Sequence, residues 1–211
     1  MKKLIALAIA ALPAAAMADV VIYGEAGAAL ENTKTTIDGK SNGSVTGVEN
    51  YNSKIGFKGS EDLGNGLKAI FQYESGFDAD TAGALAGGRD TFAGLTGGFG
   101  TVVAGRLTHP LRAMGAKVEL MPGASGVGTT MSVTGRIGGL NTGADDRASN
   151  AIAYVSPSFG GFSGTVAYVN GETQPNGNGA AEARQYQIAG QYDNGPLFVG
   201  AGYHRADNIG G

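Results

Sequence analysis

The stretch Tyr51–Glu74, YNSKIGFKGSEDLGNGLKAIFQYE, alternates polar and apolar residues through two consecutive runs. The lysines of the first run fall on one side, and its isoleucine and phenylalanine fall on the other. Successive side chains of a strand project to opposite faces, so this alternation predicts two strands, Ser53–Gly59 and Leu67–Glu74. The polar, glycine-containing segment Ser60–Gly66 between them predicts a compact turn.

The same alternation recurs along the chain and predicts about nine strands in all. Short turns alternate with long connections, and residues 31–50 are expected to form the first long loop. Tight turns on one rim and long loops on the other are typical of an all-β, antiparallel, up-and-down transmembrane β-barrel. The other expected strands are Asp19–Leu30, Arg89–Thr96, Thr101–Arg106, Ala151–Val155, Phe162–Val169, Gln185–Tyr192 and Leu197–His204.

The composition agrees with a barrel in a membrane. Glycine supplies 38 of 211 residues and cysteine none, so neither disulfides nor long helices are favoured. In such a barrel the apolar set faces lipid and the polar set faces water inside, whereas a soluble β-sandwich would bury the apolar set. The net charge of −3 and the lack of a basic block argue against a nucleic-acid partner.

The first 18 residues have the pattern of a secretory signal peptide. Lys2 and Lys3 precede an uncharged run, Leu4–Ala18, which ends in the small-residue cleavage motif Ala16-Met17-Ala18. The run is shorter than the roughly 18–20 residues that a membrane-spanning helix needs, which disfavours the alternative of a retained anchor. We therefore expect residues 1–18 to be removed and residues 19–211 to belong to the barrel.

Four segments carry a resemblance to a known family: DVVIYG at 19–24, KIGFKGSEDLGNGLKAIFQYE at 54–74, RDTFAGLTGGFGTVVAGR at 89–106 and FSGTVAYV at 162–169. They resemble the general diffusion porins of Gram-negative β-proteobacteria, the neisserial type. The resemblance implies a barrel of about 16 strands in the outer membrane. It also implies a homotrimer, contacts with membrane lipid and lipopolysaccharide, and passive diffusion of small hydrophilic solutes and ions.

The chain stops at Gly211, after about nine of the strands that the resemblance implies. Single-chain bacterial barrels have an even number of strands, and nine strands also leave open edges, which cannot face lipid. We therefore expect this sequence to be the N-terminal portion of a larger porin. The alternative is a small closed outer-membrane barrel that acts as an adhesin or structural surface protein.

Pore chemistry depends on the charges that line the channel. Residues 107–148 form the longest segment without strand pattern, and we expect an inward-folded constriction loop there, with a short helix within Leu111–Met121. A mobile surface loop is the alternative. The expected basic lining is Lys54, Lys58, Lys68, Arg89 and Arg106, and the expected acidic residues are Glu25, Glu119, Asp145 and Asp146. By resemblance, the basic wall would be Lys54, Arg89 and Arg106; the alternative is that some of these side chains lie at the rim, in solvent or against lipopolysaccharide phosphates.

Enzyme, metal and cofactor motifs were not found. The spacing Gly123-x4-Gly128 resembles a phosphate-binding loop, but Thr129 stands where that motif requires lysine. His109 and His204 lie far apart in a chain without cysteine, so no metal-ligand spacing is present. The sequence therefore predicts neither an enzyme nor a cofactor.

Overall fold

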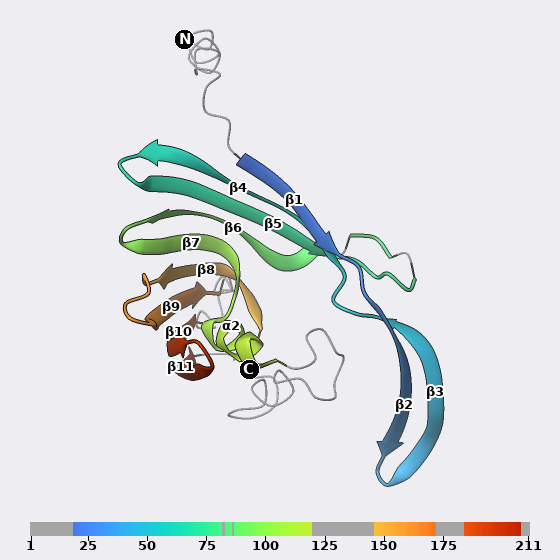
Figure 1. Cartoon of the computed structure of the whole chain (residues 1–211). Coiled ribbons are helices and arrows are strands. Elements are labelled where there is room, and N and C mark those ends of the chain that lie inside the picture. The colour runs from blue at the N-terminus through green and yellow to red at the C-terminus, as the bar shows by residue number, and fades with distance from the viewer. Residues whose placement is uncertain (1–18, 82, 86, 120–145, 172–183, 208–211) are drawn as a thin grey trace, which may run out of the picture.

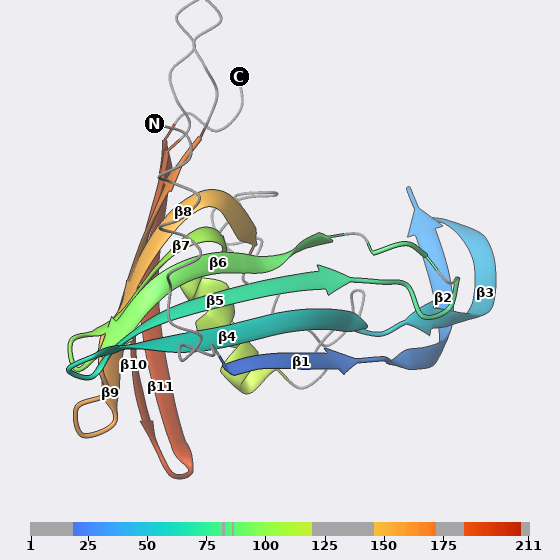
Figure 2. The same cartoon turned by 90° about the horizontal axis from the view of Figure 1, so that it is seen from above.

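The computed structural model describes residues 19–81, 83–85, 87–119, 146–171 and 184–207, so the expected signal peptide lies outside the described residues. Within these residues nine strands form one antiparallel sheet in the order β1-β4-β5-β6-β7-β8-β9-β10-β11, which confirms the predicted strand number and fold class. The sheet is strongly curved, with a convex and a concave face (Figures 1 and 2). The bounds are β1 (Asp19–Glu25), β4 (Lys54–Gly64), β5 (Leu67–Gly76), β6 (Gly87–Gly97), β7 (Gly100–Thr108), β8 (Arg147–Val155), β9 (Phe162–Asn170), β10 (Arg184–Asn194) and β11 (Leu197–Asp207).

Tight turns close the hairpins at one end of the sheet. Between β4 and β5 the chain turns at Asn65 and Gly66, with φ of 52° and 77°, as a two-residue hairpin turn requires. The predicted turn at Ser60–Gly66 was too long, because β4 continues to Gly64 and pairs with β5 up to Leu67. At the opposite end the connections are longer, which confirms the predicted asymmetry; they span residues 77–86, 109–146 and 171–183.

The segment after β1 differs from the prediction. The expected strand Asp19–Leu30 ends at Glu25, and the expected loop at residues 31–50 belongs to a separate hairpin of β2 (Ala28–Ile37) and β3 (Lys40–Asn50). This hairpin projects from the sheet (Figure 1). Its polar residues conceal the strand pattern because both of its faces are largely exposed. The turn signal was nevertheless present as Asp38-Gly39, both with positive φ.

The convex face of the sheet is apolar and exposed. Strand register places Ile22 beside Phe57, and Phe57 beside Tyr73, and these residues are 68%, 38% and 45% exposed, respectively. Tyr154 and Ile188 continue the exposed face on β8 and β10. Such a surface would be unstable in water and suits hydrocarbon.

The concave face carries a short helix and a patch of apolar side chains. The helix α2 (Pro110–Gly115) and the 3-10 helix η1 (Ala116–Val118) lie against this face (Figure 2). Among the described residues no helix is long and apolar enough to cross a bilayer. The buried apolar cluster of the patch consists of Val103, Leu107, Ala151 and Val169, with Ile70, Phe92, Ala148 and Ala153 packed around it.

Candidate pore-lining site

The first charged group on the concave face joins β1 and β4. Strand register sets Glu25 opposite Lys54, and Lys54 Nζ lies 2.6 Å from Glu25 Oε2. Asn52 Nδ2 lies 3.4 Å from the same oxygen. Lys54, predicted as basic lining, and Glu25, predicted as acidic lining, are therefore paired with each other on the same face of the sheet.

Glu74 holds the second group together. Tyr23 donates its hydroxyl hydrogen to Glu74 Oε2 at 2.9 Å, and Arg89 Nε donates to Glu74 Oε1. Arg89 Nη2 also approaches Asn52 Oδ1 at 3.4 Å, which links this group to the first. An irregularity in the β5–β6 register between Tyr73 and Ser75 accompanies this contact. The Glu74 side chain is only 8% exposed, and Arg89 is its ion-pair partner.

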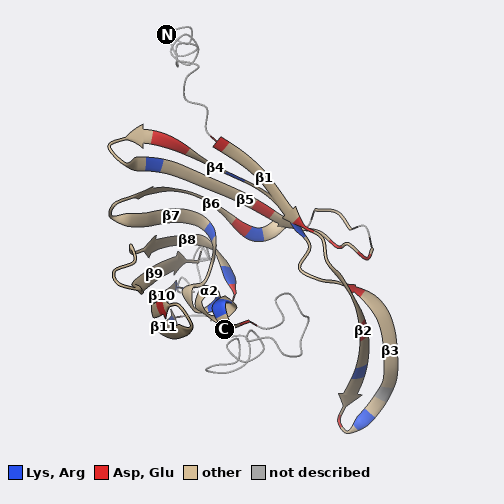
Figure 3. Ribbon diagram, viewed as in Figure 1, with Lys and Arg blue, Asp and Glu red and all other residues tan. Residues whose placement is uncertain are grey.

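A third group forms where β6, β7 and β8 meet. Asp90 Oδ1 accepts hydrogen bonds from Thr108 N at 2.6 Å and from the Thr108 hydroxyl at 2.8 Å. Asp90 Oδ2 accepts from Arg147 Nε at 3.3 Å. Asp90 of β6 and Arg147 of β8 thus approach each other across β7. Figure 3 shows acidic and basic residues gathered at this end of the sheet.

Arg106 lies apart from these groups. It follows Gly105, whose φ of 148° interrupts the regular strand, and Ala104, which is exposed on the convex side. Its Nε donates to Gly88 O at 2.8 Å and its Nη1 donates to Ser149 Oγ at 3.2 Å. Arg106 is therefore anchored at the long-connection end of the sheet by neutral acceptors.

The remaining predicted lysines share the concave face but not an ion pair. Lys58 Nζ lies 5.2 Å from the centre of the Tyr23 ring, and its register partner on β5 is Gln72. Lys68 pairs in register with Asp62 and Thr96, close to the tight turns. Both lysines are exposed, and neither forms an ion pair within the described part of the chain.

Two of the predicted acidic residues of the loop, Glu119 and Asp146, lie at the two described ends of this loop. Glu119 follows η1 and is half-buried. Asp146 precedes β8; its carbonyl oxygen accepts from His109 N at 3.0 Å and its Oδ1 accepts from Arg147 N at 2.7 Å. Asp145 lies outside the described residues.

The start of the loop after β7 is docked on the concave face of β10 and β11. A Cβ atom on Gly202 would lie 2.3 Å from Leu111 Cδ2, and one on Gly200 would lie 2.4 Å from Met114 Sδ. These two glycines therefore leave the space that α2 occupies. The predicted helix within Leu111–Met121 is shorter in the structure: α2 and η1 end by Val118, and the chain is extended at Glu119.

Two polar contacts accompany this packing. Leu111 N donates to Gln187 Oε1 at 3.4 Å, and Lys117 Nζ of η1 lies 2.7 Å from Asp193 Oδ2 of β10. His109, only 2% exposed, stands before α2 with its ring centre 6.1 Å from that of His204. The segment from His109 to Val118 is thus held against the wall by apolar, hydrogen-bonding and ionic contacts.

Comparison with known proteins decides the family. The sequence profile of the Gram-negative porins matches residues 4–211. The chain belongs to the Gram-negative porin family. This membership confirms the resemblance seen in the sequence, and it places the chain in the outer membrane.

Relatives of this porin include outer membrane proteins of Neisseria. It is 39% identical over 202 residues to the major outer membrane protein P.IB of Neisseria gonorrhoeae, covering 94% of the chain and 55% of the relative. It is 39% identical over 219 residues to the protein of the same name from Neisseria meningitidis serogroup B / serotype 15 (strain H44/76), covering 99% of the chain and 60% of the relative. The chain thus spans little more than half the length of these relatives.

A solved structure supports the same fold. The anion-selective porin from Comamonas acidovorans superimposes with a TM-score of 0.72 at 30% sequence identity. The match covers 89% of this porin chain and 57% of that protein. The fold of the described sheet is therefore shared with a known porin.

Sequence reasoning missed three members of the charged groups on this porin's strands, namely Glu74, Asp90 and Arg147. Strand alternation could have predicted Glu74, because its side chain lies on the same face as those of Lys68 and Gln72. Asp90 and Arg147 lie at strand ends, where alternation gives no reliable direction. Which acidic residue pairs with which basic residue could not be predicted without the strand register.

Proposed function

We propose that the chain forms part of the wall of a water-filled channel through which small hydrophilic solutes and ions diffuse passively across the outer membrane. The observation that carries this proposal is the division of one curved sheet into two faces. The convex face exposes Ile22, Phe57 and Tyr73, which suit lipid, and the concave face carries paired charges and a docked helix. This arrangement matches a barrel with a polar lumen.

The charged groups would act as the lining of the channel. Lys54, Arg89 and Arg147 are neutralised by Glu25, Glu74 and Asp90, respectively. Among the predicted lining residues, the basic Lys58, Lys68 and Arg106 and the acidic Asp146 have no ion pair within the described residues, which leaves three unpaired positive charges against one negative charge. An excess of unpaired positive charge raises the local concentration of anions, so we propose a preference for anions.

The docked segment would form the beginning of the constriction loop. Its contacts with Gly200, Gly202 and Asp193 place α2 and η1 on the concave side of the sheet, where they would narrow the channel. The acidic counterpart of the basic wall is then not limited to the loop, because Glu25, Glu74 and Asp90 stand on the wall itself.

We further propose a homotrimer that contacts membrane lipid and lipopolysaccharide. The resemblance to the neisserial-type porins supports the trimer, and the exposed aromatic residues Tyr73, Tyr154 and Tyr203 of the convex face support the contact with lipid. Small hydrophilic solutes are proposed because a water-filled lumen would admit them.

The first test is electrical. The full-length protein, reconstituted in planar bilayers, should produce stepwise current increases that are ohmic, because a fixed water-filled pore conducts in proportion to voltage. Single-channel recording in potassium chloride measures the step size. Folded trimers that insert without conductance would remove the channel proposal.

The second test concerns anion preference. The substitution Arg106→Glu should shift the reversal potential in a potassium chloride gradient toward cation selectivity, because it exchanges an unpaired positive charge for a negative one. Glu61→Lys, at an exposed position outside the predicted lining, is the control and should leave the reversal potential near the wild-type value. An unchanged reversal potential in Arg106→Glu would place this residue outside the ion path.

A further inference from the structure

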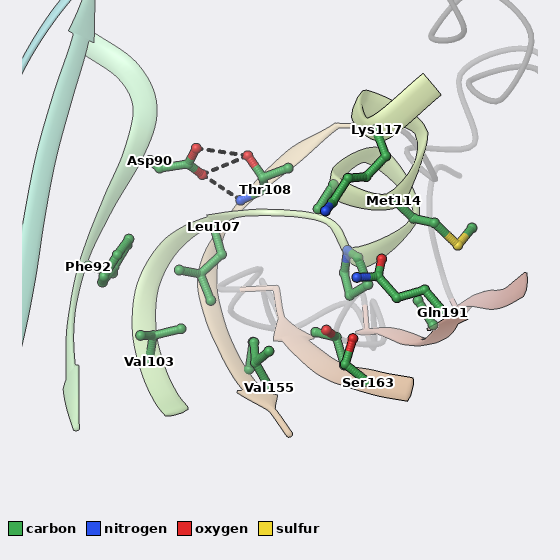
Figure 4. A pocket seen from close by; sticks show the side chains of 15 residues that line it. Asp90, Phe92, Val103, Leu107, Thr108, Met114, Lys117, Val155, Ser163 and Gln191 are labelled. Carbon is green, nitrogen blue, oxygen red and sulfur yellow. Dashed lines mark hydrogen bonds between the residues drawn. The ribbon is translucent and has the colours of Figure 1, made fainter. Parts of the chain in front are cut away.

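A cavity of about 360 Å³ lies between α2 and the concave wall (Figure 4). Val103, Leu107 and Val155 approach it from the wall, while Met114 and Lys117 belong to the helical segment above it. Its lining is mostly apolar, although the strand pattern of a porin places polar residues on the inner face. The cavity therefore differs in chemistry from the charged groups described above.

The charged residues that line the cavity already have hydrogen-bond or ion-pair partners. Asp90 is engaged by Thr108 and Arg147, and Lys117 is paired with Asp193. An ionic ligand would consequently find no unpaired charge among the described lining residues. A charged solute would lose its hydration on entry without gaining a counter-ion, which is unfavourable.

The cavity does offer neutral hydrogen-bonding groups. Ser163 and Gln191 are paired in register on β9 and β10, and both line the cavity. Within the described part of the chain neither side chain is engaged in a hydrogen bond, and Figure 4 shows them together on one side of the cavity. They can therefore receive a hydroxyl or amide group of a ligand.

The size of the cavity sets the size of the ligand. An apolar protein cavity of about 150 Å³ stays dry and accommodates one benzene ring. The cavity beneath α2 is more than twice as large and has neutral polar groups on one side, so it fits a ring with a polar substituent. Water inside would find few partners along the apolar wall and would be displaced readily.

We propose that this cavity is a saturable binding site for small uncharged aromatic solutes that carry a hydroxyl or amide group. The ring packs between α2 and the wall at Val103 and Leu107, and the polar group faces Ser163 and Gln191. This inference goes beyond passive diffusion, because a bound solute would dwell at the channel wall rather than cross an inert opening.

Benzamide is the probe, titrated into the folded full-length protein in detergent micelles and followed by ligand-observed NMR. We expect saturable binding with a dissociation constant on the order of 1 mM, as for other ligands of this size. Benzoate and benzylammonium at pH 7 should bind at least tenfold more weakly. Equal binding of benzamide, benzoate and benzylammonium would overturn the proposal, because a site without an unpaired charge should bind the neutral compound more tightly than either ion.

Variants separate the cavity from other surfaces. Ala153→Leu fills the cavity and should weaken benzamide binding at least tenfold, while Ala104→Leu, exposed on the convex side, should leave it unchanged. Ser163→Ala should weaken binding by about threefold to tenfold through one lost hydrogen bond, and it serves if Ala153→Leu does not fold. Non-saturable uptake that is identical in all variants would mean partition into the micelle and would refute the site. Binding is measured without a membrane, so this outcome is distinct from a loss of conductance.

Discussion

Replacing Gly202 with leucine is expected to detach α2 from the wall of the channel. The Cβ atom alone would lie 2.3 Å from Leu111 Cδ2 and 3.1 Å from the carbonyl oxygen of Ile188, so a whole leucine side chain claims the space that Leu111 occupies. Overpacking of this kind costs about 1–3 kcal/mol. That cost corresponds to a rise of about fivefold to 150-fold in the undocked population of the segment.

Limited proteolysis measures this population directly. Trypsin cleavage after Lys117 tracks the equilibrium population of the undocked segment when docking is fast relative to cleavage. The cleavage rate in the folded protein should therefore rise at least fivefold in Gly202→Leu, and the single-channel current should lose its single stable level. The ion pair between Lys117 and Asp193 cannot prevent this, because both side chains are more than 40% exposed and such pairs contribute little.

Gly190→Leu is the matched control for this prediction. Gly190 lies on the neighbouring strand β10, and a Cβ atom there would meet nothing within 4 Å. This variant should keep the wild-type cleavage rate and conductance. If Gly202→Leu folds, resists trypsin and conducts like the wild type, the contact of Leu111 with Gly202 does not hold α2 in place.

The sheet could be predicted from the sequence because its pattern is set by a simple physical contrast. Each strand has lipid on one side, so alternation is enforced at positions such as Ile55 and Phe57, and the tight turns carry signals such as Asn65-Gly66. The hairpin of β2 and β3 has no buried face, so it lacks that contrast. Its strands escaped prediction even though Asp38-Gly39 marked the turn.

The site could be predicted only in part, because alternation gives the face of a residue and not its partner. Lys54 and Glu25 were both expected to line the lumen, yet their direct pairing depends on the register of β1 with β4. The apolar patch around Val103 and Leu107 breaks the alternation rule for a polar lumen. The side chains of this patch are buried by contacts between residues that are far apart in the sequence, and no local sequence pattern predicts such contacts.

The ion pair of Glu74 with Arg89 is expected to be the most costly of the described charge pairs to break. The Glu74 side chain is 8% exposed and Arg89 is 21% exposed, so removal of the carboxylate in Glu74→Ala leaves a poorly hydrated guanidinium and an unmatched Tyr23 hydroxyl. Breaking a pair of this type costs about 2–3 kcal/mol, with some water access at Arg89 reducing the penalty. Guanidinium titration in detergent micelles measures the free energy of unfolding.

A double-mutant cycle isolates the pair from the loss of packing. Arg89→Ala combined with Glu74→Ala removes both charges, so the double variant should be more stable than the sum of the single effects predicts, by about 1–3 kcal/mol. Glu61→Ala is the control, since that carboxylate is exposed on the same hairpin, and it should change stability by less than about 0.5 kcal/mol. Strictly additive single effects would mean that Glu74 and Arg89 contribute independently, and the concave wall would then owe its stability to backbone pairing and apolar packing rather than to matched charges.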